Sequence, residues 1–295
     1  METRFTRREV LGLVGAGAAV LGASSLASSA TKNEATPAQQ EEQAMTPLEK
    51  FNKYGEDLEY HLMLRTSPIA AKMLVSESDI PVGAFRPKKE RGYHFAQCQA
   101  FALSRRDGVT IAMLKEDHWC PAAPLAYGNV PPNQQSQDYD CFPYGKYVGI
   151  VTAPLKTASF IPDVVIIWSN NAQLRSLILS MDRKDSSQIK SCFLPPSCSY
   201  SVVNPIQDGN YWVVLPDPGE YERGLGTEDE MMFSAPGARM ESLISGLRKG
   251  EKGYFAYRHH HPYIRPNFPR PDFYRQSFKS WGLDADDTLD WPEYK

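Results

Sequence analysis

The stretch YVGIVTAPLKTASFIPDVVIIWS occupies residues 147–169 and decides the fold class of this chain. It contains two apolar runs, 147–155 and 163–169, that are rich in β-branched residues and are not broken by charged side chains. Uninterrupted runs of this kind are typical of strands that are covered on both faces. Asn170 or Asn171 can cap the amphipathic segment 172–183 that follows. The stretch therefore predicts two buried strands and a helix.

Weaker signals of the same two kinds lie on either side of this stretch. Further strands are predicted at 68–75, 109–114 and 211–216, and further helices at 47 to about 64, 95–105 and 238–250. The first helix has a clear start, because Thr46, Pro47 and Glu49 form a capping box with proline at the first helical position. Strands and helices alternate irregularly. We therefore expect a mixed α/β (α+β) fold, with a single main domain over 47–250 in which helices flank a central mixed sheet.

The composition changes after residue 250. Residues 254–295 carry 11 of the 33 aromatic residues of the chain, together with five prolines. Disordered tails are poor in aromatic residues. We expect an irregular, aromatic and Pro-rich C-terminal extension over 251–295 that lies on the main domain.

The first 30 residues read as a signal peptide. Arg7 and Arg8 precede a weakly apolar run, 10–26, that is diluted by glycine and alanine, and small residues follow up to Ala30. The run is short for a spanning helix, which needs about 20 strongly apolar residues, although an uncleaved anchor is the alternative. An arginine pair in this place resembles the twin-arginine motif, which implies passage through the twin-arginine export machinery in a folded state, often with a cofactor already inserted. We expect a periplasmic or other extracytoplasmic protein, with a flexible linker over 31–46.

Composition excludes several kinds of partner. The chain has 295 residues and a formal net charge of −3, so no electrostatic footprint for nucleic acid or an anionic membrane is present. No second apolar run could cross a bilayer, and we expect a soluble protein once the signal is removed. The motifs of conventional hydrolases and nucleotide-binding enzymes are missing from the sequence. Whether the chain is an enzyme stays open.

Four of the five cysteines are candidate ligands for a cofactor: Cys98, Cys120, Cys192 and Cys198. Thiolates are soft ligands suited to iron, zinc or an iron–sulfur cluster. Cys192 and Cys198 flank the stiff loop FLPPS, which could present both sulfurs to one centre, but no Cys-x-x-Cys pair occurs anywhere. Three interpretations stay open at this point: a thiolate-bound metal or iron–sulfur cofactor, one or more disulfides, and thiols that fill core space.

Two histidines could complete a mixed site. His94 and His118 each lie within four residues of a cysteine, and on a helix His94 and Cys98 would share a face. We include both as candidate metal ligands. A hydrogen-bonded structural role is the alternative for each histidine.

Four segments, taken in order, resemble the landmarks of the bacterial and archaeal domain-of-unknown-function family 169. They are HFAQCQAFAL (94–103), HWCPAAPLAYG (118–128), VTAPLKTASFIPDVVII (151–167) and EDEMMFSAPGARMESLISGL (228–247). The resemblance covers roughly 62–247 and leaves out the signal, the linker and the C-terminal extension. It brings no established activity. It implies a cysteine near VVLPDPGEYERG, where this chain has Asp217, so a ligand set inferred for the family is incomplete here.

These observations lead to two functional hypotheses. The first is an exported accessory or electron-transfer protein that holds a metal or iron–sulfur cofactor on its cysteines and meets a redox partner protein. The second is a non-catalytic small-molecule binding module with structural cysteines. Neither hypothesis specifies an oligomeric state.

Overall fold

The computed structural model describes residues 44–87, 95–135, 140–181, 189–192, 196–217, 220, 226–227, 229–251 and 279. All of them lie in one compact unit, 44–295. The predicted signal peptide 1–30 and most of the linker 31–46 lie outside the described residues. So does the C-terminal extension, apart from 251 and 279.

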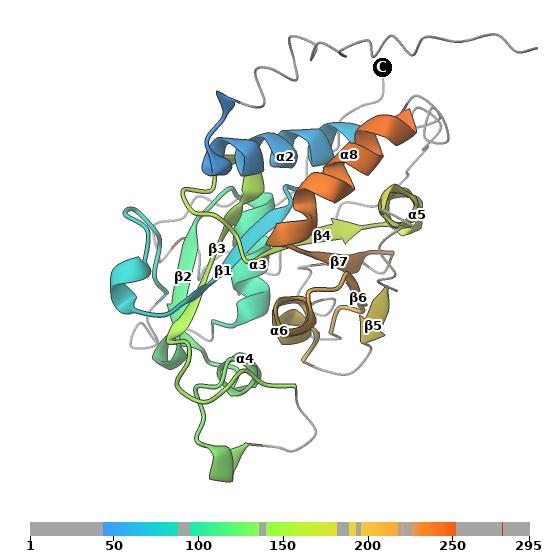
Figure 1. Cartoon of the computed structure of the whole chain (residues 1–295). Helices are drawn as coiled ribbons and strands as arrows, with labels where there is room; N and C mark the ends of the chain where they lie inside the picture. The colour runs from blue at the N-terminus through green and yellow to red at the C-terminus, as the bar shows by residue number, and fades with distance from the viewer. Residues whose placement is uncertain are drawn as a thin grey trace, which may run out of the picture. The chain divides into compact units, whose positions relative to one another are not determined.

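A seven-stranded mixed sheet forms the centre of the described part, as the sequence predicts (Figure 1). Its strands run in the spatial order β2-β3-β1-β4-β7-β6-β5. Neighbouring strands pair antiparallel throughout, except for the parallel pair β5–β6 at one edge. The strands are β1 (Ile69–Leu74), β2 (Ile111–Leu114), β3 (Gly149–Pro154), β4 (Val164–Ser169), β5 (Lys190–Cys192), β6 (Trp212–Val214) and β7 (Met231–Pro236).

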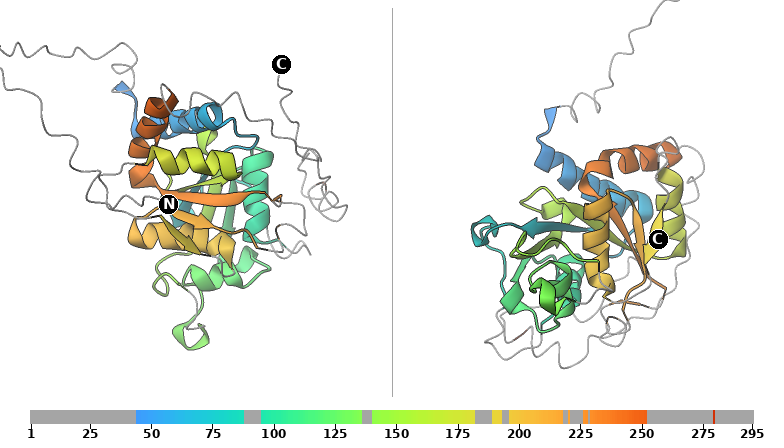
Figure 2. Two further views of the ribbon diagram at one scale, coloured as in Figure 1. Left: turned by 90° about the vertical axis from the view of Figure 1, so that its right-hand side faces the viewer. Right: turned by 60° about the horizontal axis from the view of Figure 1, so that its bottom comes forward.

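Helices cover the two faces of this sheet (Figures 1 and 2). The helices α2 (Pro47–Leu62), α5 (Asn171–Ser180) and α8 (Met240–Glu251) pack on one face, where their apolar residues form a core with alternate residues of the strands. The helices α3 (Gln97–Arg106), α4 (Ala122–Ala126) and α6 (Ser197–Asp208) pack on the other face. Every residue of β3 and β4 is consequently buried, which confirms the interpretation of residues 147–169.

The predicted helix starts are present. The Thr46 side chain accepts a hydrogen bond from the Glu49 backbone, and the Glu49 carboxylate accepts one from the Thr46 backbone at 2.7 Å, so α2 begins with the expected capping box. Asn170 and Gln173 form the corresponding pair at the start of α5. Of the described helices, none has the length and hydropathy needed to cross a membrane.

The region after residue 189 differs from the sequence-based expectation. Cys192 ends strand β5, and Cys198 lies in the first turn of α6, a helix that the sequence analysis did not identify. The helix contains Pro205 and serine at alternate positions of its first turn, and both residue types lower helix propensity. It forms because its residues 197–205 are all buried against the sheet and its neighbours.

Candidate functional site

Cys98 and Cys198 occupy equivalent places in two buried helices. Each is the second residue of its helix, α3 or α6, and each is flanked by two identical polar residues, glutamines around Cys98 and serines around Cys198. Cys120 is half-buried in the bend that leads into α4. The helices α3, α4 and α6 pack against the same face of the sheet, so three cysteines that are far apart in the sequence lie in one layer.

The three cysteines form a cluster. Cys120 packs against a small buried group formed by Ala96, Cys98 and Ala102. Burial raises the pKa of the Cys198 thiol well above its usual range, and negative charge on Glu220, Asp217, Cys98 and Cys120 raises it further, in that order. Groups from α3, from the bend before α4 and from the segment after β6 therefore act on the sulfur of one α6 residue. We call Cys98, Cys120 and Cys198 the thiol cluster.

Two carboxylates accompany the thiol cluster. Glu220 is 1 % exposed, and its carboxylate accepts a hydrogen bond from the Asp217 backbone at 2.8 Å. The Glu220 backbone donates in turn to the Asp217 carbonyl oxygen at 2.9 Å, which closes a tight turn. Asp217 stands where the family resemblance implies a cysteine, and it is one of the residues that act on Cys198.

Several polar side chains beside the thiol cluster are buried without a hydrogen-bond partner in the described part of the chain. Their atoms are the amide nitrogen and oxygen of Gln97, the Ser197 hydroxyl, the Tyr127 hydroxyl and His118 Nδ1. None of these side chains belongs to a residue more than 5 % exposed. A buried polar group without a partner costs about 1–3 kcal/mol. These groups make the region around the thiol cluster polar within an otherwise apolar layer.

His118 and Tyr127 form one side of this polar region. Their rings meet edge to face, with centroids 6.4 Å apart. Burial lowers the pKa of His118 to about 3, so the imidazole is neutral at physiological pH. Burial and the charge of Cys198 raise the pKa of Tyr127 well above its usual value, so the phenol also stays neutral. Both groups can only donate or accept hydrogen bonds as uncharged side chains.

The starts of α3 and α6 leave helix amide groups uncapped. Neither Ala96 nor Pro196, the residues that precede these helices, makes a side-chain capping bond. The first N–H groups of a helix carry a partial positive charge that favours anions, including thiolates. Cys98 and Cys198 both lie in the first turn of their helices.

A buried ion pair fixes the far end of α3. Arg105 pairs with Glu230 at 3.0 Å, and its guanidinium lies over the Trp168 ring, 4.0 Å from the centroid. Ser104 also shares a 2.9 Å hydrogen bond with Thr152 of β3. These contacts tie α3 to the sheet and so position Cys98 at its other end.

The other predicted ligands are placed differently. Cys192 is half-buried at the end of the edge strand β5 and packs against the same apolar core. His94 lies outside the described residues. His118 is described, and its contact in the site is with Tyr127. All five cysteines are described, and the structure contains no disulfide among them. No group of three or more His, Cys, Asp or Glu side chains in the described part is arranged to hold a metal ion as it stands.

Sequence reasoning identified the cysteines but missed Gln97, Ser197, Tyr127 and Glu220. One signal was present: QCQ at 97–99 and SCS at 197–199 each place a cysteine between two identical polar residues. The position of Tyr127 beside Cys198 had no counterpart in the sequence pattern.

Comparison with known proteins gives one relationship. No curated protein and no solved structure matches the chain. The family model of domain of unknown function 169, described as uncharacterised ArCR, matches residues 57–140 and 133–246. These matches span more than half of the chain and contain all three residues of the thiol cluster. The chain therefore belongs to the DUF169 family.

Proposed function

We propose that this protein binds a thiophilic metal ion or an iron–sulfur cofactor at the thiol cluster. The observation that carries the proposal is that Cys120 packs against the buried group that contains Cys98, and that both cysteines act on Cys198, although the three come from separate segments of the chain. Cys192, His94 and His118 are proposed as additional ligands. An ion would draw sulfur atoms to about 2.3 Å from itself, so the proposal includes contraction of the cluster around it.

The electrostatics of the cluster favour a cation. Burial and the negative charges of Glu220, Asp217, Cys98 and Cys120 all raise the cost of ionising the Cys198 thiol. A soft cation removes both penalties at once, because it neutralises the thiolates and replaces their lost hydration. Thiolate sulfur suits zinc, iron and iron–sulfur clusters better than it suits magnesium or calcium.

The neutral donors around the cluster suit a centre that carries net negative charge. The amide of Gln97, the Ser197 hydroxyl and the Tyr127 hydroxyl can each donate a hydrogen bond to a thiolate or to a sulfide. Hydrogen bonds of this kind tune the potential of thiolate-bound iron. The same groups explain why the polar region is costly to bury when no cofactor is bound.

The place of action that we propose is outside the cytoplasm. The support is the Arg7–Arg8 pair before a weakly apolar run, since twin-arginine export carries folded proteins that already hold their cofactor. Together with a thiolate site, this signal supports a role as an accessory or electron-transfer component that exchanges electrons with a redox partner protein.

The test is metal analysis of the protein purified without oxygen. We expect iron or zinc in a fixed ratio to the chain and, for iron, visible absorption from sulfur-to-iron charge transfer. Reconstitution of metal-free protein with Co²⁺ provides a second readout, because thiolate ligation produces intense near-ultraviolet bands.

Cysteine variants locate the site. Cys98→Ser, Cys120→Ser and Cys198→Ser should each lose most of the bound metal and of the Co²⁺–thiolate band. Cys141→Ser is the matched control, because Cys141 is also half-buried but is not among the groups that act on Cys198. A colourless, metal-free protein that also fails to bind Co²⁺ would contradict the proposal. Cys192→Ser decides whether that residue is a ligand.

A further inference from the structure

A cavity lies in another part of the domain, and none of the residues of the thiol cluster lines it. It has a volume of about 260 Å³ and opens between the 3₁₀ turn Glu77–Asp79, the end of β2 and the segment 128–148. Its lining includes Glu77, Lys115, Glu116, Tyr144 and Tyr147, and none of the cysteines lines it. A cavity of this size is smaller than the pockets that hold drug-sized ligands, so it suits a molecule of about a dozen non-hydrogen atoms.

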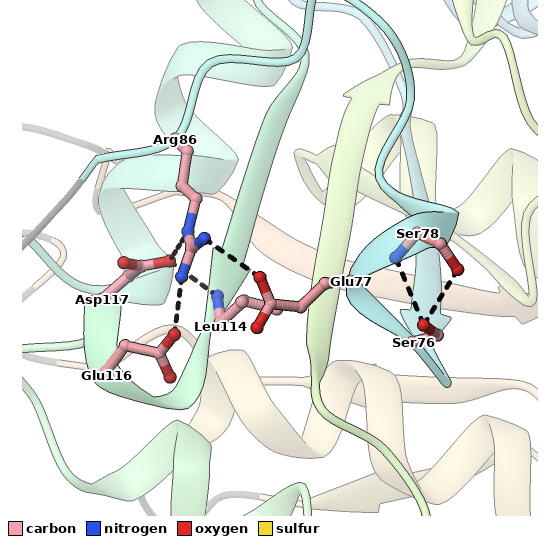
Figure 3. A network of polar contacts seen from close by, with 7 residues as sticks. All are labelled: Ser76, Glu77, Ser78, Arg86, Leu114, Glu116 and Asp117. Carbon is pink, nitrogen blue, oxygen red and sulfur yellow. Dashed lines mark hydrogen bonds and ion pairs between the residues drawn. The ribbon is translucent and has the colours of Figure 1, made fainter.

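Arg86 holds the acidic side of this cavity in place (Figure 3). Its guanidinium bonds Asp117 at 2.7 Å, Glu116 at 2.6 Å and Glu77 at 3.4 Å. Asp117 is buried and also accepts a hydrogen bond from the Leu114 backbone at 2.9 Å, which anchors the whole group to β2. Glu77 and Glu116 each give one carboxylate oxygen to Arg86. Among the described residues nothing donates to the second oxygen of either carboxylate, so each can accept a hydrogen bond from a ligand.

The aromatic side of the cavity is also fixed. Gly128 has a φ of +72°, and a Cβ added there would lie 2.6 Å from the carbonyl oxygens of Phe142 and Pro143, so only glycine lets the two segments approach. The Tyr147 ring packs edge to face on Phe142, with centroids 4.8 Å apart. Tyr144 lines the cavity and has 56 % of its surface exposed, so its ring is accessible to a ligand.

The charges around the cavity cancel. Three charged residues line the cavity, namely Glu77, Lys115 and Glu116. Three more lie next to the lining: Arg86 and Asp117, which pair with each other, and Lys146, whose ammonium lies 4.9 Å from the Tyr147 ring centroid. The six formal charges sum to zero. A ligand with net charge would therefore leave one charge without a counterpart in a partly desolvated place. A neutral ligand that donates to carboxylates, accepts from an ammonium and presents C–H groups to tyrosine rings fits all of these groups.

We propose that this cavity binds a neutral polyhydroxylated molecule of monosaccharide size. Hydroxyl groups of the sugar donate to the available oxygens of Glu77 and Glu116, and a ring oxygen or hydroxyl accepts from Lys115. The apolar face of the sugar ring lies on Tyr144. Arg86 is a positioning residue, because it holds both glutamates without lining the cavity itself. The site is independent of the proposed metal site.

The experiment measures the binding of D-glucose, D-galactose and N-acetyl-D-glucosamine to the full chain by saturation-transfer NMR and isothermal titration calorimetry. We expect saturable binding of at least one probe, with a dissociation constant in the millimolar range. Tyr144→Ala should weaken it at least tenfold. Tyr60→Ala is the matched control, because Tyr60 has the same exposure of 56 % but lies in α2 and does not line the cavity; its binding should be unchanged.

Two further sets of probes distinguish a free sugar from a glycan chain and a neutral ligand from a charged one. A disaccharide, maltose or N,N′-diacetylchitobiose, shows by tighter binding that the ligand is the end of a glycan chain rather than a free sugar. Glycine and putrescine test a zwitterion and an amine. The proposal is overturned if none of the sugars saturates, if Tyr144→Ala and Tyr60→Ala behave alike, or if glycine or putrescine binds more tightly than every sugar. Cys98→Ser should retain sugar binding, so failure of the metal site would not be mistaken for failure here.

Discussion

At the scale of single residues, Tyr127 best shows how the site differs from an ordinary core. Its ring is fully buried and packs among apolar side chains, yet its hydroxyl has no partner in the described part. Tyr211 on the opposite face of the sheet is buried to a similar degree, and its hydroxyl donates to the Arg239 carbonyl oxygen at 3.2 Å. Two tyrosines of similar burial thus differ in energetic cost, because the Tyr211 hydroxyl has a hydrogen-bond partner and the Tyr127 hydroxyl has none in the described part.

This contrast predicts opposite effects for the same substitution. Tyr127→Phe should stabilise the metal-free protein by about 1 kcal/mol, because it removes an unsatisfied buried group, whereas Tyr211→Phe should cost about 1 kcal/mol through the loss of a hydrogen bond. Urea unfolding of metal-free protein measures both. The metal-loaded Tyr127→Phe protein should lose that advantage if the hydroxyl bonds to the centre. Destabilisation of the metal-free protein by Tyr127→Phe would show that the hydroxyl is already satisfied.

At the scale of elements, close contact between α5 and α8 completes the helical layer on the face opposite the site. A Cβ added at Gly246 of α8 would overlap the carbonyl oxygen of Ser180 at the end of α5. Arg248 then pairs with Asp57 of α2, 2.5 Å from Nη2 to Oδ2. The three helices therefore form one layer, and the predicted amphipathic pattern of 238–250 is explained by its apolar contacts within it.

Gly246→Ala tests this packing. Alanine is favoured over glycine in a helix by about 1 kcal/mol, so an isolated helix would gain stability. Here we expect a net loss of about 1–3 kcal/mol, because the methyl group must push α5 and α8 apart. Thermal unfolding monitored by circular dichroism measures the change. Ser242→Ala in the same helix is the control and should change stability by less than about 0.5 kcal/mol. A gain in stability from Gly246→Ala would mean that the helices do not approach so closely.

At the scale of the whole molecule, the described residues belong to one compact unit that begins at Ala44. The capping box that starts α2 is complete with Thr46 and Glu49, and all described residues belong to the unit 44–295. The family match begins at residue 57 and ends at residue 246. The part of the chain before Ala44 falls within the predicted signal peptide and linker. We expect these segments to direct export and to add nothing to the hydrophobic core.

A chain shortened at its N-terminus tests whether the residues before Ala44 contribute to the stability of the domain. Protein that begins at Ala44 should unfold at the same temperature as the full chain within about 2 °C, and it should bind Co²⁺ equally well, because the capping box and the thiol cluster are retained. Differential scanning calorimetry and the Co²⁺–thiolate band provide the two measurements. A fall in melting temperature of several degrees would show that residues before Ala44 pack on the domain.

Local pattern was enough for much of the fold. The β-branched composition of the runs at 147–155 and 163–169 favours buried strands, and the Thr46–Glu49 capping box and the cap at Asn170 are local signals for a helix start. Pattern failed at α6, where serines and Pro205 disfavour a helix in isolation. Burial between the sheet and its neighbours overrides that preference, and no short window of sequence contains this information.

The sequence by itself determined the mixed α/β class, the family and the identity of the thiols that deserve a test. Only the tertiary structure decided that Cys98, Cys120 and Cys198 gather while Cys192 lies at an edge strand, and that Tyr127, Gln97 and Ser197 surround them with unsatisfied polar groups. It also assembled the sugar-sized cavity from segments more than 60 residues apart in the chain. The reason is physical: propensity and hydrophobic periodicity act over a few residues, whereas a site depends on which helix ends the packing of the core brings together.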